Sequence, residues 1–226
     1  CAARVDKPTG KVEIEPDSNN EPHYIIRKDV AWDYLPYTSE LTTLAETADA
    51  ICFGSLAQRQ ETSRNTLLKF LRHMKQDALK IFDINLRENF YDKDIIESSI
   101  KVCNILKVNK SEANILAEMF GYTTGNEEYI SRKLLADFNL KMVILTCDKT
   151  CSYIFTPTET SYLKTPVVKV ADTVGAGDSF TATFCAFYMQ GKSIRQAHEA
   201  AIRVAAYVCE HEGATPKWPQ KLRNEI

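Results

Sequence analysis

Several absences limit what this chain can be. No apolar run approaches the roughly 20 residues that cross a bilayer, so we expect no membrane-spanning segment and no membrane partner. Charge of one sign is not in excess, because 28 Lys and Arg face 30 Asp and Glu. The formal net charge of −2 therefore indicates no nucleic acid or other polyanion as a partner. The sequence also lacks internal repeats, low-complexity tracts and long linkers.

Two common nucleotide-binding motifs are missing as well. A dinucleotide fingerprint would need a glycine at the position of Phe180. The P-loop pattern is approached at Gly191-Lys192-Ser193, but its first glycine would fall on Ala186, inside a helical run rather than after a strand. We interpret that segment as the end of a helix followed by a turn.

The cysteines show no disulfide or zinc pattern. The seven are scattered, odd in number and without any C-x-x-C pair. We interpret them as free thiols of a reducing cytoplasm; a metal site at Cys147 and Cys151 is the alternative, but no histidine supports it. The chain begins with Cys1. An acylated lipoprotein is one explanation, and we prefer a chain that starts partway through a gene product.

What the sequence does contain is an α/β pattern. Its 226 residues, 44% hydrophobic and 26% charged, suffice for one sizeable core. Short apolar runs alternate with helical periodicity from Ala50 onward, which predicts a parallel sheet with helices on both faces. Ligands of such a sheet bind at the carboxyl ends of its strands. We predict strands at 50–53, 80–84, 104–108, 142–146 and 151–155, and helices at 61–75, 94–102, from Ser111, 129–138, 178–190 and 193–211.

Residues 1–35 depart from this alternation. Segments 11–15 and 23–27 alternate polar and apolar residues, and turn-forming residues at 16–20 separate them. This pattern predicts a β-hairpin with one polar face. We expect the hairpin to stand apart from a single main domain at 36–226, because strands of a buried parallel sheet are apolar on both faces. An edge hairpin of the main sheet is the alternative.

The strongest chemical signal is the run Asp172-Thr173-Val174-Gly175-Ala176-Gly177-Asp178, which follows a β-rich stretch at 167–170. Two glycines one residue apart let the backbone direct successive N–H groups at one spot. A helix beginning at Asp178 adds the positive end of its dipole, so the run predicts a site for an anion such as phosphate. Asp178 at its edge is suited to be a base for a nucleophile; a helix-capping Asp is the alternative.

This run resembles the C-terminal signature of the PfkB (ribokinase-like) family of sugar kinases, D-T-x-G-A-G-D, at every fixed position. The resemblance implies a ribokinase-like three-layer α/β/α sandwich with a mostly parallel sheet and a small β lid, formed here by residues 1–35. It also implies that Asp178 is the catalytic base, and that the amides of Gly175, Ala176 and Gly177 form the anion hole. The implied cofactors are ATP and Mg²⁺.

Polar residues follow two other predicted strands. Asn85 and Arg87 leave the strand 80–84, where the alternative is a surface loop with a helix-capping Asn. Their D-x-N-x-R segment resembles fructokinase-like members of the family, which implies that both contact the substrate and that Arg87 is catalytic. Asn109 and Glu112 are three residues apart at a helix start and could hold the hydration shell of Mg²⁺. The N-x-x-E spacing is the family's second marker; a cap at Ser111 is the alternative.

Weaker matches extend the resemblance over the whole chain. The segment 54–59 resembles one near the sugar site of fructokinases, which implies a substrate contact at Gln58. The segment 212–216 resembles the loop beside the nucleotide base. The ATP-binding residues that the resemblance implies are Asn109, Thr146, Thr173, Gly175, Gly177, Gly213 and Ala214. In many members the segment equivalent to 212–216 and the D-T segment also supply carbonyls to a monovalent cation. This implies a possible K⁺ site here at Asp172 and Val174.

The sequence departs from the family pattern at two places. The family has a T-x-G-x-x-G turn after the strand equivalent to 142–146, whereas Asp148 and Cys151 stand here at the glycine positions. An added carboxylate near the nucleotide would weaken ATP binding. Family members also begin with a strand that carries a sugar-binding Asp, followed by a Gly-Gly segment, and neither is present. We interpret this as the absence of an N-terminal portion.

The predicted function is that of an ATP-dependent sugar kinase, with fructose as the preferred acceptor. The hairpin would exclude water as a lid, and its apolar face could join two subunits in a homodimer. A non-catalytic sugar or nucleotide sensor on the same fold is the alternative, which the altered turn favours. A kinase that phosphorylates 2-keto-3-deoxygluconate or a nucleoside is a second alternative.

Overall fold

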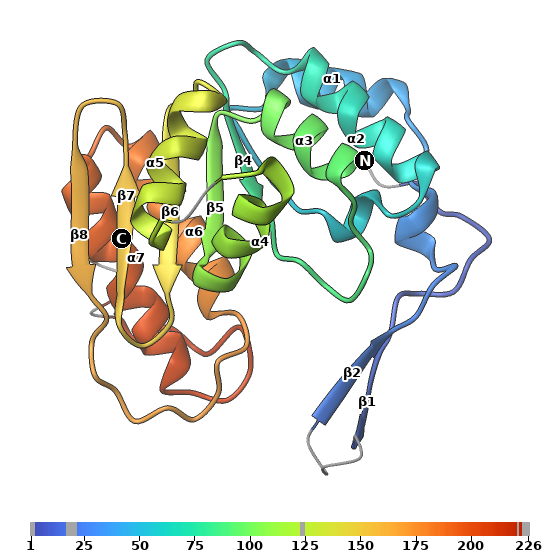
Figure 1. Ribbon diagram of the computed structural model, residues 1–226. Helices are drawn as coiled ribbons and strands as arrows, with labels where there is room; N and C mark the ends of the chain where they lie inside the picture. Colours follow the sequence, from blue (N-terminus) through green and yellow to red (C-terminus); the bar gives the residue numbers. More distant parts are fainter. Residues whose placement is uncertain (1–2, 17–21, 123–124, 221, 223–226) are drawn as a thin grey trace. The chain divides into compact units, whose positions relative to one another are not determined.

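The computed structural model describes residues 3–16, 22–122, 125–220 and 222 (Figure 1). The chain consists of two compact units, Cys1–Leu106 and Lys107–Ile226. In the described ranges, no helix combines the length and the apolar character that crossing a bilayer requires.

The first unit opens with the predicted β-hairpin. Strand β1 (Val12–Pro16) pairs antiparallel with strand β2 (Pro22–Ile26), with Glu13 opposite Ile25. The two strands form a sheet of their own, which excludes the alternative of an edge hairpin on the main sheet. The hairpin extends away from the rest of this unit (Figure 1). The predicted turn between the strands falls largely on residues 17–21, outside the described residues.

Two parallel strands, three α-helices and two short 3-10 helices make up the rest of the first unit. Strand β3 pairs in parallel with β4, with Cys52 opposite Ile81, as the predicted strand–helix alternation requires. Helix α2 buries Phe70 and Leu71. The elements are η1 (Ala31–Tyr34), α1 (Ser39–Thr47), β3 (Ala50–Phe53), η2 (Leu56–Gln58), α2 (Glu61–His73), β4 (Leu79–Asp83) and α3 (Lys93–Val102).

Helix α1 is an element that the hydrophobic pattern does not predict. Its first turn is capped by Thr38, whose Oγ1 accepts a hydrogen bond from Leu41 N at 3.4 Å. Only Leu41 and Ala45 are buried, and the helix packs against α2. Two buried residues in nine give too narrow an apolar stripe to be recognised from the sequence.

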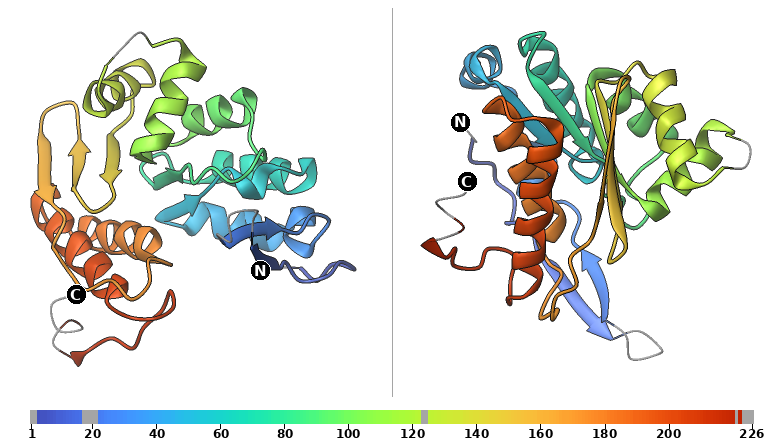
Figure 2. Two further views of the ribbon diagram at one scale, coloured as in Figure 1. Left: turned by 60° about the horizontal axis from the view of Figure 1, so that its bottom comes forward. Right: turned by 90° about the vertical axis from the view of Figure 1, so that its left-hand side faces the viewer.

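The second unit carries helices on both faces of a sheet. Its strands lie in the order β5-β6-β7-β8. Strand β5 begins at Ile105, whereas the second unit begins at Lys107. Helices α6 and α7 cover one face, and α4 and α5 cover the other (Figure 2). The elements are β5 (Ile105–Asn109), α4 (Lys110–Phe120), α5 (Glu127–Asp137), β6 (Met142–Cys147), β7 (Cys151–Phe155), β8 (Thr160–Lys164), α6 (Ala176–Met189) and α7 (Ile194–Cys209).

The core of the second unit centres on β6. Met142 to Leu145 are four consecutive residues with at most 1% of their surface exposed. A strand that is covered on both faces buries every side chain, which explains the uninterrupted apolar run at 142–145. From α7, the small residues Ala200 and Ala201 are also buried, so this helix can approach its neighbours closely.

The sheet of the second unit is not parallel throughout. Strand β7 pairs antiparallel with both β6 and β8. Strand β8 was not among the predicted strands, because its buried pattern is a single serine, Ser161, between exposed and half-buried residues. Conversely, the β-rich stretch at 167–170 is not a strand, and Val167 is fully exposed. β-branched residues favour strands only where packing supports them.

Three predicted helix starts are also wrong. Helix α5 begins at Glu127, two residues before the predicted start at Tyr129. Helix α4 begins at Lys110 with Asn109 as its N-cap, so Ser111 is not the cap. Helix α6 begins at Ala176 with Gly175 as its N-cap, two residues earlier than predicted. Asp178 is therefore the third residue of α6, and the alternative of a capping Asp is excluded.

A buried histidine ties α7 to the sheet of the second unit. His198 is fully buried, with hydrogen bonds to Ser152 Oγ of β7 (Nε2, 2.8 Å) and Ser161 Oγ of β8 (Nδ1, 2.9 Å). Burial lowers the pKa of His198 to about 4, and the nearby charge of Arg195 acts in the same direction. The imidazole is therefore neutral at physiological pH.

Candidate active site

The glycine-rich turn of the second unit is locked against a neighbouring loop. Gly175 has a φ of +80°, a conformation that residues with a Cβ rarely adopt. A Cβ at this position would lie 2.7 Å from Ala214 Cα and 2.7 Å from Ala214 Cβ. Glycine is required here for both reasons, and the contact brings two segments predicted to bind the nucleotide, 172–178 and 212–216, side by side.

Asp172 holds the same two segments together. Its Oδ1 accepts a hydrogen bond from Val174 N at 3.0 Å, and its Oδ2 accepts one from Gly213 N at 3.1 Å. These two bonds, that from Val174 first, hold the pKa of Asp172 below its usual range. The amides of Ala171 and Asp172 also donate to Cys209 O, at 2.8 Å and 3.3 Å. The turn is thus fixed without any regular strand before it.

Asp178 is an exposed carboxylate in the first turn of α6. The N–H groups of a helix's first turn have no acceptor within the helix, and those of Gly177 and Asp178 lie there. The amide of Ala176, which the resemblance assigned to the anion hole, instead donates to Thr173 O at 3.3 Å. The arrangement offers an anion the positive end of a helix dipole and places a carboxylate next to it.

A buried lysine near this turn was missed by sequence reasoning. Lys107 lies on β5 with 7% of its surface exposed. Its Nζ would be 3.5 Å from a Cβ built on Gly177. The signal that could have found it is a charged residue within the apolar run Ile105 to Val108 of this strand.

Asn109 and Glu112 form a capping box at the start of α4. Asn109 Oδ1 accepts from Glu112 N at 2.9 Å and from Ser111 Oγ at 2.7 Å, and Glu112 Oε2 accepts from Asn109 N at 2.8 Å. The Glu112 side chain is 5% exposed. The side chains of Asn109 and Glu112 are thus held next to each other, as two residues that bind one hydrated Mg²⁺ together would have to be. Their role toward Mg²⁺ stays a prediction.

The turn after β6 shows how the sequence replaces a family glycine. Asp148 has a φ of +47°, in the left-handed region that glycine favours and that short polar side chains tolerate. Thr165 Oγ1 donates to Asp148 O at 3.0 Å, which stabilises the turn. Cys147 and Cys151 lie opposite each other across the hairpin, and burial raises the pKa of Cys147 to about 12. Both cysteines pack within the β6–β7 pair of strands. Thr146 lies on β6, directly before Cys147.

Asn85 and Arg87, in the first unit, lie exposed in the loop after β4, as expected for side chains at the end of a strand. Asn85 has a φ of +40° and Glu88 one of +46°, so this loop holds two non-glycine residues in the left-handed region. Glu88 Oε1 accepts a hydrogen bond from Ile26 N at 3.1 Å, which ties the loop to the hairpin. The Arg87 guanidinium donates to Leu86 O at 3.0 Å.

Gln58 has a structural environment. It is fully buried, and its Nε2 donates to Gly54 O and to Ser99 Oγ, each at 2.9 Å. An amide with no exposed surface offers a substrate nothing to bind. The geometry therefore favours a packing role for Gln58 over the substrate contact that the resemblance implied.

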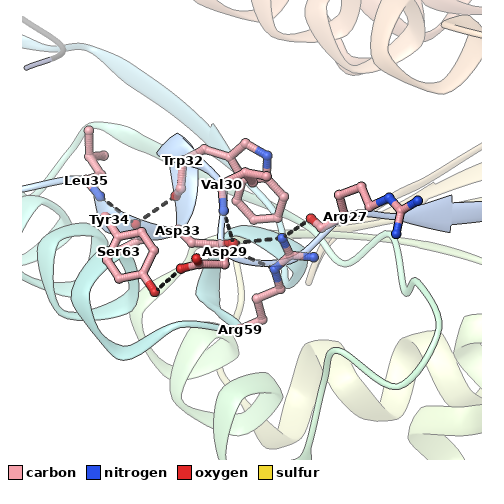
Figure 3. Close-up of polar contacts among 9 residues, drawn as sticks. All are labelled: Arg27, Asp29, Val30, Trp32, Asp33, Tyr34, Leu35, Arg59 and Ser63. Atoms are coloured by element: carbon pink, nitrogen blue, oxygen red, sulfur yellow. Dashed lines mark hydrogen bonds and ion pairs between the residues drawn. The ribbon is translucent and has the colours of Figure 1, made fainter. Parts of the chain in front are cut away.

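An arginine that sequence reasoning did not select fixes the base of the hairpin (Figure 3). Arg59 donates to Asp33 from Nε and from Nη2, each at 2.8 Å, and from Nη2 to Arg27 O at 2.6 Å. The two side chains are 5% and 0% exposed. The guanidinium carbon also lies 4.0 Å from the Trp32 ring centroid and 4.7 Å from that of Phe90.

No group of three or more His, Cys, Asp or Glu residues in the described ranges could hold a metal ion. Mg²⁺ keeps several waters and needs few protein oxygens, so Asn109 and Glu112 supply a donor set that suits it. The carbonyls of Asp172 and Val174 remain a predicted K⁺ site.

Comparison with known proteins gives the family. Residues 3–221 match the pfkB family carbohydrate kinase. The uncharacterized sugar kinase PH1459 of Pyrococcus horikoshii is 26% identical over 216 residues, which are 91% of this chain and 63% of that protein. "Probable fructokinase-3" of Arabidopsis thaliana is 28% identical over 221 residues, 91% of this chain and 62% of that protein. The chain thus spans less than two thirds of the length of these two relatives.

Solved structures show the same fold. The crystal structure of PH1459 in complex with ATP has a TM-score of 0.78 at 23% identity and covers 99% of this chain and 74% of that one. Ribokinase from Thermotoga maritima has a TM-score of 0.73 at 21% identity and covers 94% of this chain and 67% of that one. They confirm the ribokinase-like α/β fold with a mostly parallel central sheet. With residues 3–221 matched, the chain belongs to the pfkB family of carbohydrate kinases.

Proposed function

We propose that the protein is an ATP-dependent kinase that phosphorylates a hydroxyl group of a monosaccharide. The observation that carries this proposal is the exposed Asp178 carboxylate in the first turn of α6, directly after the turn fixed by Gly175. An anion site alone has no use for a carboxylate at its edge, because like charges repel. Phosphoryl transfer to a hydroxyl needs both an anion site for the phosphate and a base for the proton of the hydroxyl.

In the proposed mechanism Asp178 accepts the proton of the acceptor hydroxyl as the hydroxyl oxygen attacks the γ-phosphorus of ATP. The bond from this phosphorus to the β-phosphate oxygen breaks, and ADP leaves. The first-turn amides of Gly177 and Asp178, together with the helix dipole of α6, stabilise the charge on the transferring oxygens. Mg²⁺, when bound beside Asn109 and Glu112, neutralises phosphate charge.

Fructose is the acceptor that we propose. Asn85 and Arg87 follow β4 in the D-x-N-x-R arrangement and lie exposed, so both side chains are available to a sugar. The similarity to "Probable fructokinase-3" supports this choice. 2-Keto-3-deoxygluconate and nucleosides are the alternative acceptors. The hairpin would serve as a lid, and we propose that it also joins two subunits.

The test is ADP release by the protein with MgATP and a panel of fructose, glucose, ribose, 2-keto-3-deoxygluconate and adenosine. Asp178→Asn should lower kcat at least about 10³-fold, because it removes the general base and leaves the shape of the site unchanged. Asp137→Asn, at the exposed end of α5, is the matched control and should leave kcat unchanged. Retention of kcat within tenfold in Asp178→Asn would contradict the proposed base.

A non-catalytic sensor is the second candidate, and one observation favours it. Asp148 places an exposed carboxylate in the turn after β6, where family members have glycine. Binding of a sugar or of ATP, with no ADP released for any acceptor, would establish the sensor. Asp148→Gly separates the two candidates further, because a kinase should then show a lower KM for ATP at unchanged kcat.

A further inference from the structure

Lys107 is buried to an extent that is rare for lysine. It is 7% exposed, between Leu106 and Val108, which are fully buried. Removing an ammonium group from water is costly unless polar partners compensate, and lysines are almost never this buried unless they are paired. The position of the ammonium group shows which part of the molecule the buried charge faces.

The ammonium group lies beside the first turn of α6. A Cβ built on Gly177 would lie 3.5 Å from Lys107 Nζ. Gly177 is the second residue of α6 and directly precedes Asp178. The buried positive charge is therefore next to the helix end that we expect to bind phosphate, and on the same side of it as the space that glycine leaves open.

The identity of Gly177 supports the same interpretation. Its φ is outside the left-handed region, in contrast to the +80° of Gly175. A helix is more stable with alanine than with glycine at an ordinary helical position, so the backbone gives no reason for glycine at 177. The atom that a methyl group there would meet is Lys107 Nζ. Glycine thus keeps clear the space beside the ammonium group, which is the space an anion would need.

We propose that Lys107 is a further catalytic residue, whose ammonium group hydrogen-bonds an oxygen of the transferring phosphoryl group across the gap left by Gly177. The proposal rests on the proposed kinase function. Lysine has three N–H donors, so it can bind this oxygen while keeping partners within the protein. The lysine takes no part in the proton transfer: the proton of the acceptor goes to Asp178, and the phosphorus exchanges its bond to ADP for one to the acceptor.

The test compares Lys107→Met, which keeps most of the length of the side chain and removes its charge, with Lys107→Arg. Lys107→Met should lower kcat about 10²–10³-fold, the usual effect of removing one donor from a developing oxyanion, and should change the KM of the sugar less than about threefold. Lys107→Arg should recover at least tenfold of that loss. Lys110→Met, an exposed lysine in the first turn of α4, is the matched control. A kcat within threefold of the native value in Lys107→Met would overturn the proposal.

Gly177→Ala tests the same contact without touching the lysine. The added methyl should lower kcat at least tenfold, because it occupies the space beside the ammonium group. The Tm should stay the same or rise by up to ~2–4 °C, since alanine favours the helix. Such a loss of activity without a loss of stability is not expected if Lys107 and Gly177 serve packing alone. An unchanged kcat in Gly177→Ala would count against the proposal.

A binding measurement separates this proposal from the proposed function. Inorganic phosphate is titrated into the native protein and into Lys107→Met by calorimetry, in the presence of MgADP and without a sugar. Native binding at least tenfold tighter than that of the variant supports Lys107 at the anion site, even if no acceptor is turned over. Equal affinity of the two proteins would overturn the role of Lys107, and turnover of a sugar by the native protein would leave the kinase proposal intact.

Discussion

At the residue scale, Gly175 and Gly191 allow a matched experiment on the glycine-rich turn. Both have a left-handed backbone, with φ of +80° and +78°. A Cβ at 175 would collide with Ala214, whereas a Cβ at 191 would meet nothing within 4 Å. Gly191→Ala should therefore cost only the backbone strain, about 1–2 kcal/mol of unfolding free energy. Gly175→Ala should cost roughly 1–3 kcal/mol more, measured by urea unfolding. Equal costs would mean that the loop carrying Ala214 moves away freely.

Single residues also show what the sequence could and could not predict about the site. The run 172–178 was identified as a turn because glycine spacing constrains the backbone locally. That Asp172 accepts a hydrogen bond from Gly213, 41 positions away in sequence, is a tertiary contact that spacing cannot indicate. The resemblance placed both segments at the nucleotide, and the structure brings them together. Lys107 escaped notice because its role depends on a neighbour, Gly177, from a distant part of the chain.

The start of α4 illustrates how local chemistry can be assigned to the wrong residue. Ser111 and Asn109 both have side chains that cap helices well, and the sequence pattern alone does not choose between them. The reciprocal bonds of Asn109 and Glu112 decide the matter, because a capping box needs a spacing of three. The same two residues that the resemblance assigned to Mg²⁺ thus begin the helix as well.

At the element scale, His198 predicts how the attachment of α7 depends on pH. The pKa of His198 falls from 6.5 to about 4 on burial. Between these values the unfolded chain binds a proton that the folded chain does not, so the unfolding free energy falls as the pH falls from 6.5 toward 4. No stability is lost above pH 6.5, and the full loss of roughly 3 kcal/mol is reached only below pH 4. Urea unfolding at pH 7.5 and pH 5 measures the larger part of this loss, roughly 2 kcal/mol.

His198→Gln should flatten this dependence, because glutamine does not titrate and can still bond to one of the two serines. His73→Gln, at the exposed end of α2, is the control and should keep the native slope. If native protein and His198→Gln lose the same unfolding free energy between pH 7.5 and pH 5, the slope comes from other groups, and His198 does not make the attachment of α7 depend on pH.

The buried ion pair below the hairpin leads to a second prediction at this scale. Asp33 accepts two hydrogen bonds from Arg59 and one from Val30 N, and it is fully buried. Asp33→Ala leaves the arginine buried without its counter-charge and should cost roughly 3–5 kcal/mol of unfolding free energy. Asp49→Ala removes an exposed pair with Lys75 and should cost at most about 1 kcal/mol.

The double variant Asp33→Ala/Arg59→Met decides whether the cost comes from the stranded charge. Apolar replacement of a whole buried pair is often neutral or stabilising, and a methionine can still pack between Trp32 and Phe90. We therefore expect the double variant to be more stable than Asp33→Ala alone. A double variant that is less stable would show that the ring contacts of the guanidinium carry the stabilisation instead.

Elements differ in how well the sequence predicted them. β4 and β6 are apolar runs of strand length, each preceded by a helix along the chain, and they were predicted to within a residue or two. β8 was missed because its exposed residues carry no run of that kind, and only pairing with β7 makes it a strand. The stretch 167–170 was predicted as strand-like from its valines, yet it finds no partner strand. Both errors arise because strand formation depends on partners that the local sequence does not show.

At the scale of the whole molecule, the candidate residues divide between the two units by the ligand that we expect them to bind. The nucleotide and phosphate residues, Asn109, Thr146, Asp172 to Asp178, Gly213 and Ala214, all belong to the second unit. Asn85 and Arg87, the proposed acceptor residues, belong to the first, as does the hairpin. This division follows the order of the motifs along the chain and makes the two ligands separable by experiment.

Hydrogen exchange should therefore report MgATP and the sugar in different segments. A ligand slows exchange where it binds and where it suppresses local opening. MgATP alone should protect the amides of 172–178 and 212–216, and fructose alone should protect the loop at 85–88. Asp178→Asn should keep the MgATP pattern while losing turnover, because its backbone amide is unchanged. Protection of 85–88 by MgATP alone, with none at 172–178, would contradict both the assignment of the anion site and the role of Lys107, since each requires the phosphates to lie at the first turn of α6.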